Sequence, residues 1–280
     1  MVRYHRTMSV PVFPASTVVV LRDAEGGGLE VYMVQRPSHS SFLASAQVFP
    51  GGRLEPDDHD ECWQALPAVS PHTNRPLAIA AVRELFEEAG LLLARDVATG
   101  GMVDLSARER TALFALRSAL IDGSRRFSRV CTDEGWRPAV DLLAPYARWV
   151  TPHLESRRFD TVFYVTRAPT GQAAEVDGQE TVAGRWVRPH VAIAEHAAGQ
   201  IVLVPPTLMT LVDLKDATTV DDALARAAAR PPRAFVPRVL IEAGVRFVLM
   251  PGDELYPATE GEALPAPTRY RLDGKIWRAE

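Results

Sequence analysis

Cysteine and long apolar runs are scarce in this chain of 280 residues. Its two cysteines, Cys62 and Cys131, are too few for a disulfide framework and match no zinc-ligand spacing. No stretch approaches the roughly 20 apolar residues that cross a bilayer, and no apolar run follows the first basic residues. We therefore expect neither a membrane helix nor a secretory signal, and we expect a cytoplasmic protein.

An excess of positive charge is also absent. The chain has 31 basic and 35 acidic residues, which gives a formal net charge of −4 at pH 7. This balance provides no positive field for unspecific binding of nucleic acid or of an anionic membrane. Only Lys215 and Lys275 are lysines; every other basic residue is arginine. We expect a globular protein that does not bind nucleic acid or a membrane surface through its overall charge.

Strand-like and helical patterns are mixed along the chain without regular alternation. Two β-rich runs, 16–21 and 29–35, flank a triple glycine and predict a hairpin. The mixture predicts an α/β fold with a mixed sheet. Further strands are expected near 47–49, 147–150, 161–166 and 184–187, and helices near 77–92, 107–121, 125–135, 189–198, 206–214 and 218–229.

Two segments interrupt this pattern. Residues 56–76 hold four prolines and little periodicity, so we interpret 59–76 as a surface excursion whose removal the fold would tolerate. The run Arg230-Pro231-Pro232-Arg233 resembles a linker ahead of a hairpin within 239–253. We expect one domain over 9–229, with a helical insertion at 107–140, and a C-terminal extension over 230–280.

The most informative segment is the helical one that ends near Gly90. Because each helical residue advances by about 100°, Glu84, Glu87 and Glu88 share one face and the apolar residues share the other. Neighbouring carboxylates repel each other, and the C-terminal end of a helix disfavours anions. Clustered carboxylates are typical ligands for Mg²⁺ or Mn²⁺. The alternative interpretation is a solvated acidic face.

An upstream glycine pair favours the metal interpretation. Gly51 and Gly52 can bring backbone close to a ligand or a metal. The run from Gly52 to Asp58, together with Arg83-Glu84-Leu85-Phe86-Glu87-Glu88-Ala89-Gly90-Leu91, resembles the Nudix box, G-x5-E-x7-R-E-U-x-E-E-x-G-U. Asp58 stands where the pattern has Glu, and residues 59–82 stand where it has seven residues.

A second set of segments resembles one branch of the Nudix superfamily. The peroxisomal CoA-diphosphatase-like proteins also carry an insertion inside the box. The runs 149–152, 157–163 and 178–187 resemble that branch as well. The resemblance implies a Nudix α/β/α sandwich with helical insertions.

The resemblance also implies roles for the residues of the box. Glu84, Glu87 and Glu88 would hold one to three divalent cations, Mg²⁺ or Mn²⁺, with a backbone carbonyl near Gly52. Arg83 would pair with a carboxylate such as Glu55 and hold loop against helix. The structural residues of the box are Arg83, Glu55, Gly51 and Gly90.

Residues outside the box complete the expected site. Either Glu180 or Glu84 would accept the proton of the attacking water, and Glu175 and Asp177 compete with Glu180 for this place. Arg36 and Arg158 are the candidate substrate-binding residues, each with an ordinary structural or surface role as its alternative.

The resemblance implies hydrolysis of a nucleoside diphosphate linked to another moiety. The first candidate is CoA or acyl-CoA, cleaved to 3′,5′-ADP and (acyl-)phosphopantetheine. One alternative is an ADP-ribose or nucleotide-sugar diphosphatase; another is a Nudix-fold regulator that binds a nucleotide without turnover. A homodimer is also expected.

Overall fold

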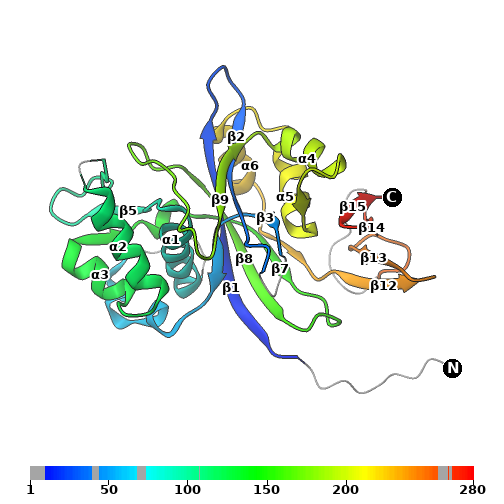
Figure 1. Cartoon of the computed structure of the whole chain (residues 1–280), viewed down its shortest axis with the longest axis horizontal. Helices are drawn as coiled ribbons and strands as arrows, with labels where there is room; N and C mark the ends of the chain where they lie inside the picture. Colours follow the sequence, from blue (N-terminus) through cyan, green and yellow to red (C-terminus); the bar gives the residue numbers. More distant parts are fainter. Residues whose placement is uncertain (1–9, 40–43, 68–73, 107, 258–263, 265–266) are drawn as a thin grey trace.

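A mixed β-sheet organises the chain in the computed structural model, which is shown in Figure 1. The structure describes residues 10–39, 44–67, 74–106, 108–257, 264 and 267–280.

Strand β1 (Val12–Asp23) lies at the centre of a nine-stranded sheet. It runs parallel to β8 over its length and pairs antiparallel with β4 and β2 along its other edge. Its side chains alternate between two buried faces, with Val18 and Val20 in one core and Val19 and Leu21 in the other. Burial on both faces explains why this strand is a continuous apolar run.

The remaining strands of the sheet confirm the predicted hairpin and add short edge strands. They are β2 (Leu29–Gln35), β3 (Ala46–Val48), β4 (Gly51–Arg53), β7 (Ala144–Val150), β8 (Arg158–Arg167), β9 (Ala183–Val187), β10 (Val202–Leu203) and β11 (Arg233–Phe235).

Helices cover both faces of the sheet, as Figure 1 shows. One face carries α1, α2, α3 and a small two-stranded sheet, β5 and β6; the other carries α4, α5 and α6. The predicted helices are confirmed within a few residues, and the layers are those of a Nudix α/β/α sandwich. Their bounds are α1 (Arg75–Ala89), α2 (Arg110–Ile121), α3 (Phe127–Glu134), α4 (Pro189–Ala197), α5 (Pro205–Leu214) and α6 (Val220–Ala228), with β5 (Ala94–Asp96) and β6 (Trp136–Pro138).

The prediction that residues 59–76 form a surface excursion is partly wrong. A 3-10 helix, Pro56–His59, leads into this segment, and a second, Glu61–Ala65, forms its first half. The Trp63 ring is buried, and its centroid lies 5.8 Å from the centroid of the Phe127 ring. Leu66 lies in the same core. This half of the insertion therefore belongs to the packed interior, and its removal would open a cavity. Residues 68–73 lie outside the described residues.

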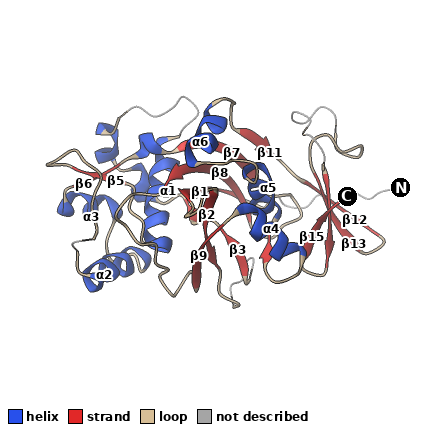
Figure 2. Ribbon diagram, turned by 90° about the horizontal axis from the view of Figure 1, so that it is seen from above, coloured by secondary structure: helices blue, strands red, loops and turns tan. Residues whose placement is uncertain are grey.

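The expected linker is also shorter than predicted. Arg233 starts β11, which runs parallel to β7 in the main sheet, so that sheet continues past residue 229. The last residues form a separate four-stranded sheet at one end of the molecule (Figure 2), and Val248 and Tyr270 from it enter the same core as α5 and α6. Its strands are β12 (Arg238–Glu242), β13 (Val245–Leu249), β14 (Arg269–Asp273) and β15 (Ile276–Ala279). The division at 229/230 stays a prediction.

None of the helices in the described part of the chain is both long enough and apolar enough to span a bilayer.

Candidate active site

Helix α1 places three glutamates inside the protein. The Asn74 side chain accepts from the Leu77 amide at 3.2 Å and caps the start, while Gly90, with φ of 66°, ends the helix in the left-handed conformation. Glu84, Glu87 and Glu88 expose 6%, 5% and 4% of their surface. The alternative of a solvated acidic face is therefore wrong, and these charges need compensation from within the site.

The glycine pair brings strand β4 against these carboxylates. The Gly51 amide donates to Oε2 of Glu88 at 2.9 Å. A Cβ atom at Gly52 would lie 2.3–2.6 Å from the carboxylate atoms of Glu84, closer than real Cβ contacts allow. Only glycine at position 52 leaves room for the observed position of Glu84.

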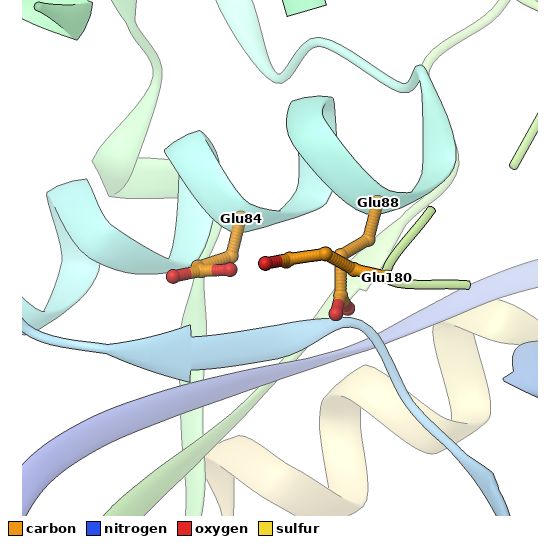
Figure 3. Close-up of side chains that lie close together, drawn as sticks. All are labelled: Glu84, Glu88 and Glu180. Atoms are coloured by element: carbon orange, nitrogen blue, oxygen red, sulfur yellow. The ribbon is translucent and has the colours of Figure 1, made fainter. Parts of the chain in front are cut away.

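A third carboxylate reaches this pair from a distant loop. One oxygen each of Glu84, Glu88 and Glu180 lie within 4.8 Å of one another. Figure 3 shows the Glu180 side chain reaching in beside the two helix glutamates from its own segment of chain. Glu180 is exposed, whereas the other two are buried, so the group opens to solvent on the Glu180 side. Three hard oxygen ligands at this spacing suit a divalent cation.

Asp177 organises the loop that carries Glu180. Its carboxylate accepts from the amides of Gln179 at 2.5 Å, Glu180 at 2.6 Å and Thr181 at 3.1 Å. The Thr181 hydroxyl donates to Asp177 and also contacts the Glu88 carbonyl at 3.1 Å. These bonds tie the loop to α1 one residue away from Glu180.

Asp177 and Glu175, the expected competitors of Glu180, are both engaged elsewhere. The Asp177 carboxylate is used for the loop amides, and Glu175 forms an ion pair with Arg110. That Asp177 and Thr181 hold this loop in place was not predicted from the sequence. The Asp177-Gly178 pair is a turn signal that could have indicated it.

Burial and mutual repulsion control the ionisation of the three glutamates on α1. Burial, opposed by Arg83, raises the pKa of Glu84 to about 7. Burial and the charge of Glu84 raise the pKa of Glu87 to about 8, and the same two causes raise the pKa of Glu88 well above its usual range. A site that favours protonation of several carboxylates is one in which a cation is strongly stabilised.

Arg83 connects helix α1 to the loop that follows β4. Its guanidinium donates to both oxygens of Asp58, at 3.1 and 3.0 Å, and to the Arg53 carbonyl at 2.9 Å. Glu55, the partner named from the sequence, lies 4.0 Å away, and Asp58, in the place of the box glutamate, makes the closer pair. The Asp58 carboxylate also accepts from the Glu55 amide at 2.8 Å and thereby holds the loop.

Arg83 also bridges Glu84 and Glu87. Its Nη1 donates to Glu84 at 2.9 Å and to Glu87 at 3.1 Å. Glu87, expected as a metal ligand, does not belong to the three-carboxylate group of Figure 3. A second arginine that the sequence reasoning missed, Arg117, is buried and donates to the Glu87 and Glu175 carbonyls, each at 2.8 Å.

The two arginines expected to bind substrate differ in position. Arg36 follows β2. Its positive charge offsets part of the rise in the pKa of Glu88 and of Glu180, which places Arg36 within electrostatic range of the carboxylates. Arg158 is buried, and its Nε donates to the Thr151 carbonyl at 3.1 Å. The structure therefore gives Arg158 a structural role at the turn between β7 and β8 and does not bring it to the carboxylates.

The fold and this arrangement define the class: the protein is a Nudix hydrolase. Residues 72–214 match the family model of the NUDT19 Nudix domain. The chain is 31% identical over 282 residues to acyl-coenzyme A diphosphatase NUDT19 of Gallus gallus, covering 81% of this chain and 73% of that protein. It is 27% identical over 289 residues to acyl-coenzyme A diphosphatase NUDT19 of Homo sapiens, covering 87% and 76%.

A solved structure supports the same assignment. The NUDIX hydrolase from Alicyclobacillus acidocaldarius has a TM-score of 0.68 and 26% identity, covering 77% of this chain and 96% of that one. The chain belongs to the family defined by the NUDT19 Nudix domain. The expected superfamily, its branch and the prediction of an enzyme are confirmed, and Nudix hydrolases as a class use divalent cations.

Proposed function

We propose that this protein hydrolyses the diphosphate of CoA or acyl-CoA to 3′,5′-ADP and (acyl-)phosphopantetheine. The similarity to acyl-coenzyme A diphosphatases over more than four fifths of the chain supports the substrate class. The single observation that supports hydrolysis most directly is the group of Glu84, Glu88 and Glu180, two of them buried. A regulator that only binds a nucleotide has no need to keep three carboxylates so close together.

The carboxylate group fits Mg²⁺ or Mn²⁺. All three donors are hard oxygens, and the missing side chain at Gly52 leaves the Glu84 carboxylate room against the strand. Bound by these residues, a divalent cation would supply positive charge for the diphosphate oxygens and would lower the pKa of a water molecule. Glu87, held by Arg83 beside this group, serves as a further candidate ligand.

Glu180 is the better candidate for the proton acceptor. Arg83 already donates to Glu84, and the Gly51 amide donates to Glu88, whereas no hydrogen bond to the Glu180 carboxylate occurs among the described residues. Although Glu180 is exposed as a residue, partial desolvation of its carboxylate, together with the charge of Asp177, raises its pKa. A carboxylate with a raised pKa takes up a proton more readily at neutral pH.

Arg36 is the candidate contact for the diphosphate. Its charge acts on Glu88 and Glu180, so an anion at the mouth of the site would meet this guanidinium. A guanidinium can bind two phosphate oxygens in a fixed geometry. The sequence-based expectations of a cytoplasmic location and a homodimer stay predictions.

A substrate panel with products identified by mass tests this function. CoA, acyl-CoA, dephospho-CoA and ADP-ribose are compared with Mg²⁺, with Mn²⁺ and with EDTA. We expect CoA species to be cleaved fastest, and dephospho-CoA to be poorer by about tenfold, equal to about 1.4 kcal/mol in kcat/KM. Faster cleavage of ADP-ribose would replace the CoA assignment by that of an ADP-ribose diphosphatase.

A matched pair of variants tests the site itself. Glu88→Gln removes one charge from the carboxylate group and should lower kcat at least ~100-fold. Glu25→Gln, on the exposed turn between β1 and β2, makes the same chemical change away from the site and should leave kcat unchanged. Activity of Glu88→Gln within a few-fold of the parent would exclude the assigned site.

A further inference from the structure

A cavity lies on the face of the sheet opposite to α1, away from the carboxylate group. Its volume is about 370 Å³, and β7, β11, α5 and the segment after α6 line it. Tyr146, Trp149 and Phe235 from the strands belong to the core on that face, whereas the three-carboxylate group stands on the α1 side. A volume of this size lies in the range of pockets that hold small molecules.

Aromatic rings form the strand side of this cavity. The Trp149 and Phe235 rings are stacked, with centroids 4.1 Å apart and an angle of 9° between the planes. The Arg230 guanidinium lies 5.1 Å from the centroid of the Tyr146 ring. Such walls can accept a planar ring by stacking or edge contact.

Positive charge dominates the helix side of the cavity. The lining cations are Lys215, Arg226, Arg230 and Arg233, against the carboxylates Asp213 and Asp216, and Arg226 is neutralised by an ion pair with Asp222. Asp213 is shared between three groups, because Arg230, Arg233 and the Tyr146 hydroxyl all contact it. One carboxylate cannot neutralise two guanidinium groups, so an excess of positive charge remains.

Two lining residues also carry buried donors without an acceptor. Nη1 of Arg230 and Nε1 of Trp149 are buried and have no hydrogen-bond partner in the described part of the chain. Lys215 is exposed and makes no ion pair with any described residue. Buried donors without acceptors cost free energy, and here both lie on residues that line a cavity with excess positive charge.

We propose that this cavity binds a nucleotide: its phosphate meets Lys215, Arg230 and Arg233, and its base lies against the aromatic wall. Each feature selects one part of such a ligand. The rings select a planar group, the excess of positive charge selects an anion, and the unsatisfied donors select an acceptor. The site is separate from the carboxylate group and does not depend on the proposed CoA reaction.

Because the chain has only two lysines, lysine acetylation followed by mass spectrometry tests the proposal within one molecule. Lys215 lines the cavity, and Lys275 is an equally exposed lysine in the turn between β14 and β15. The full chain is treated with N-hydroxysuccinimide acetate, with EDTA present and with AMP, adenosine or inorganic phosphate added. AMP at ten times its dissociation constant should slow acetylation of Lys215 about tenfold and leave Lys275 unchanged.

Variants and partial ligands decide whether the proposal holds. Arg233→Gln should weaken the protection by AMP, whereas Arg129→Gln, an exposed arginine on α3, should not alter it. Adenosine or phosphate alone should protect Lys215 less than AMP does. Equal protection of both lysines, no protection, or equal protection by phosphate and AMP would overturn the nucleotide assignment.

Discussion

Replacing Gly52 by alanine should damage the site while the protein remains folded. The added Cβ atom would lie 2.3–2.6 Å from three carboxylate atoms of Glu84, and ordinary contacts begin at 3.4 Å. The carboxylate must therefore retreat by about 1 Å, and a misplacement of that size costs about 100-fold in rate, or roughly 2.7 kcal/mol. The backbone at Gly52 has no left-handed φ, so alanine introduces no backbone strain there.

The effect of Gly52→Ala on stability should be small because the end of one side chain can move. Part of the 2.9 Å bond between Arg83 and Glu84 is lost, and the lower entropy of unfolded alanine offsets this. We expect the free energy of unfolding to change by about 1 kcal/mol or less. Chemical denaturation measures it, and diphosphate hydrolysis with saturating Mg²⁺ measures the rate.

Substitutions at two other glycines serve as controls. A Cβ at Gly51 would lie 2.3 Å from the Ser16 carbonyl oxygen and 2.7 Å from the Thr17 Cα, which are backbone atoms that cannot move alone. Gly51→Ala should therefore destabilise the fold by about 1–3 kcal/mol. Gly101→Ala meets only a side-chain oxygen at 3.6 Å and should change neither property. Full activity of Gly52→Ala would refute the reasoning.

Three further outcomes are expected. Asp177→Asn weakens the acceptor of the loop amides and should lower kcat about tenfold through Glu180. The affinity of the protein for the product, measured without metal, should not change, and an unchanged kcat would contradict the positioning role. Asp58→Ala leaves the buried Arg83 without its main partner and should cost about 3–5 kcal/mol in denaturant unfolding; a loss below about 1 kcal/mol would contradict that pairing. Because the pKa of Glu84 is raised from 4.5 to about 7, the folded metal-free protein binds more protons than the unfolded chain between these two pH values. Its contribution to stability should therefore fall as pH rises towards neutrality, and Mg²⁺ affinity, measured by calorimetry, should rise about tenfold per pH unit there for each proton displaced; a pH-independent affinity would exclude the linkage.

The sequence by itself determined the elements whose signals are local. The periodicity predicted helix α1 and its end near Gly90, and the shared face of Glu84, Glu87 and Glu88 follows from helical geometry alone, whereas the cap at Asn74 emerged only in the structure. The β-branched run at the centre of the sheet predicted a strand because both of its faces are buried. Periodicity and turn residues act over a few positions, so they can be read from the chain directly.

Only the tertiary structure decided which distant residues meet. Glu180 comes from a loop more than ninety positions after Glu88, and the register of β9 beside β2 together with the Asp177 network sets its place. Asp58 lies closer to Arg83 than Glu55 does because Asp58 is buried in the first 3-10 helix, whereas the Glu55 side chain is exposed.

Arg158 and the insertion were interpreted wrongly for the same physical reason. A charged residue before a strand and a proline-rich segment are both typical of a surface, yet Arg158 is buried at a turn and Trp63 fills the core. Burial depends on which elements pack over a residue, and local composition does not specify that. The cavity between β7, β11 and α5 likewise exists only because segments far apart in the chain pack around it.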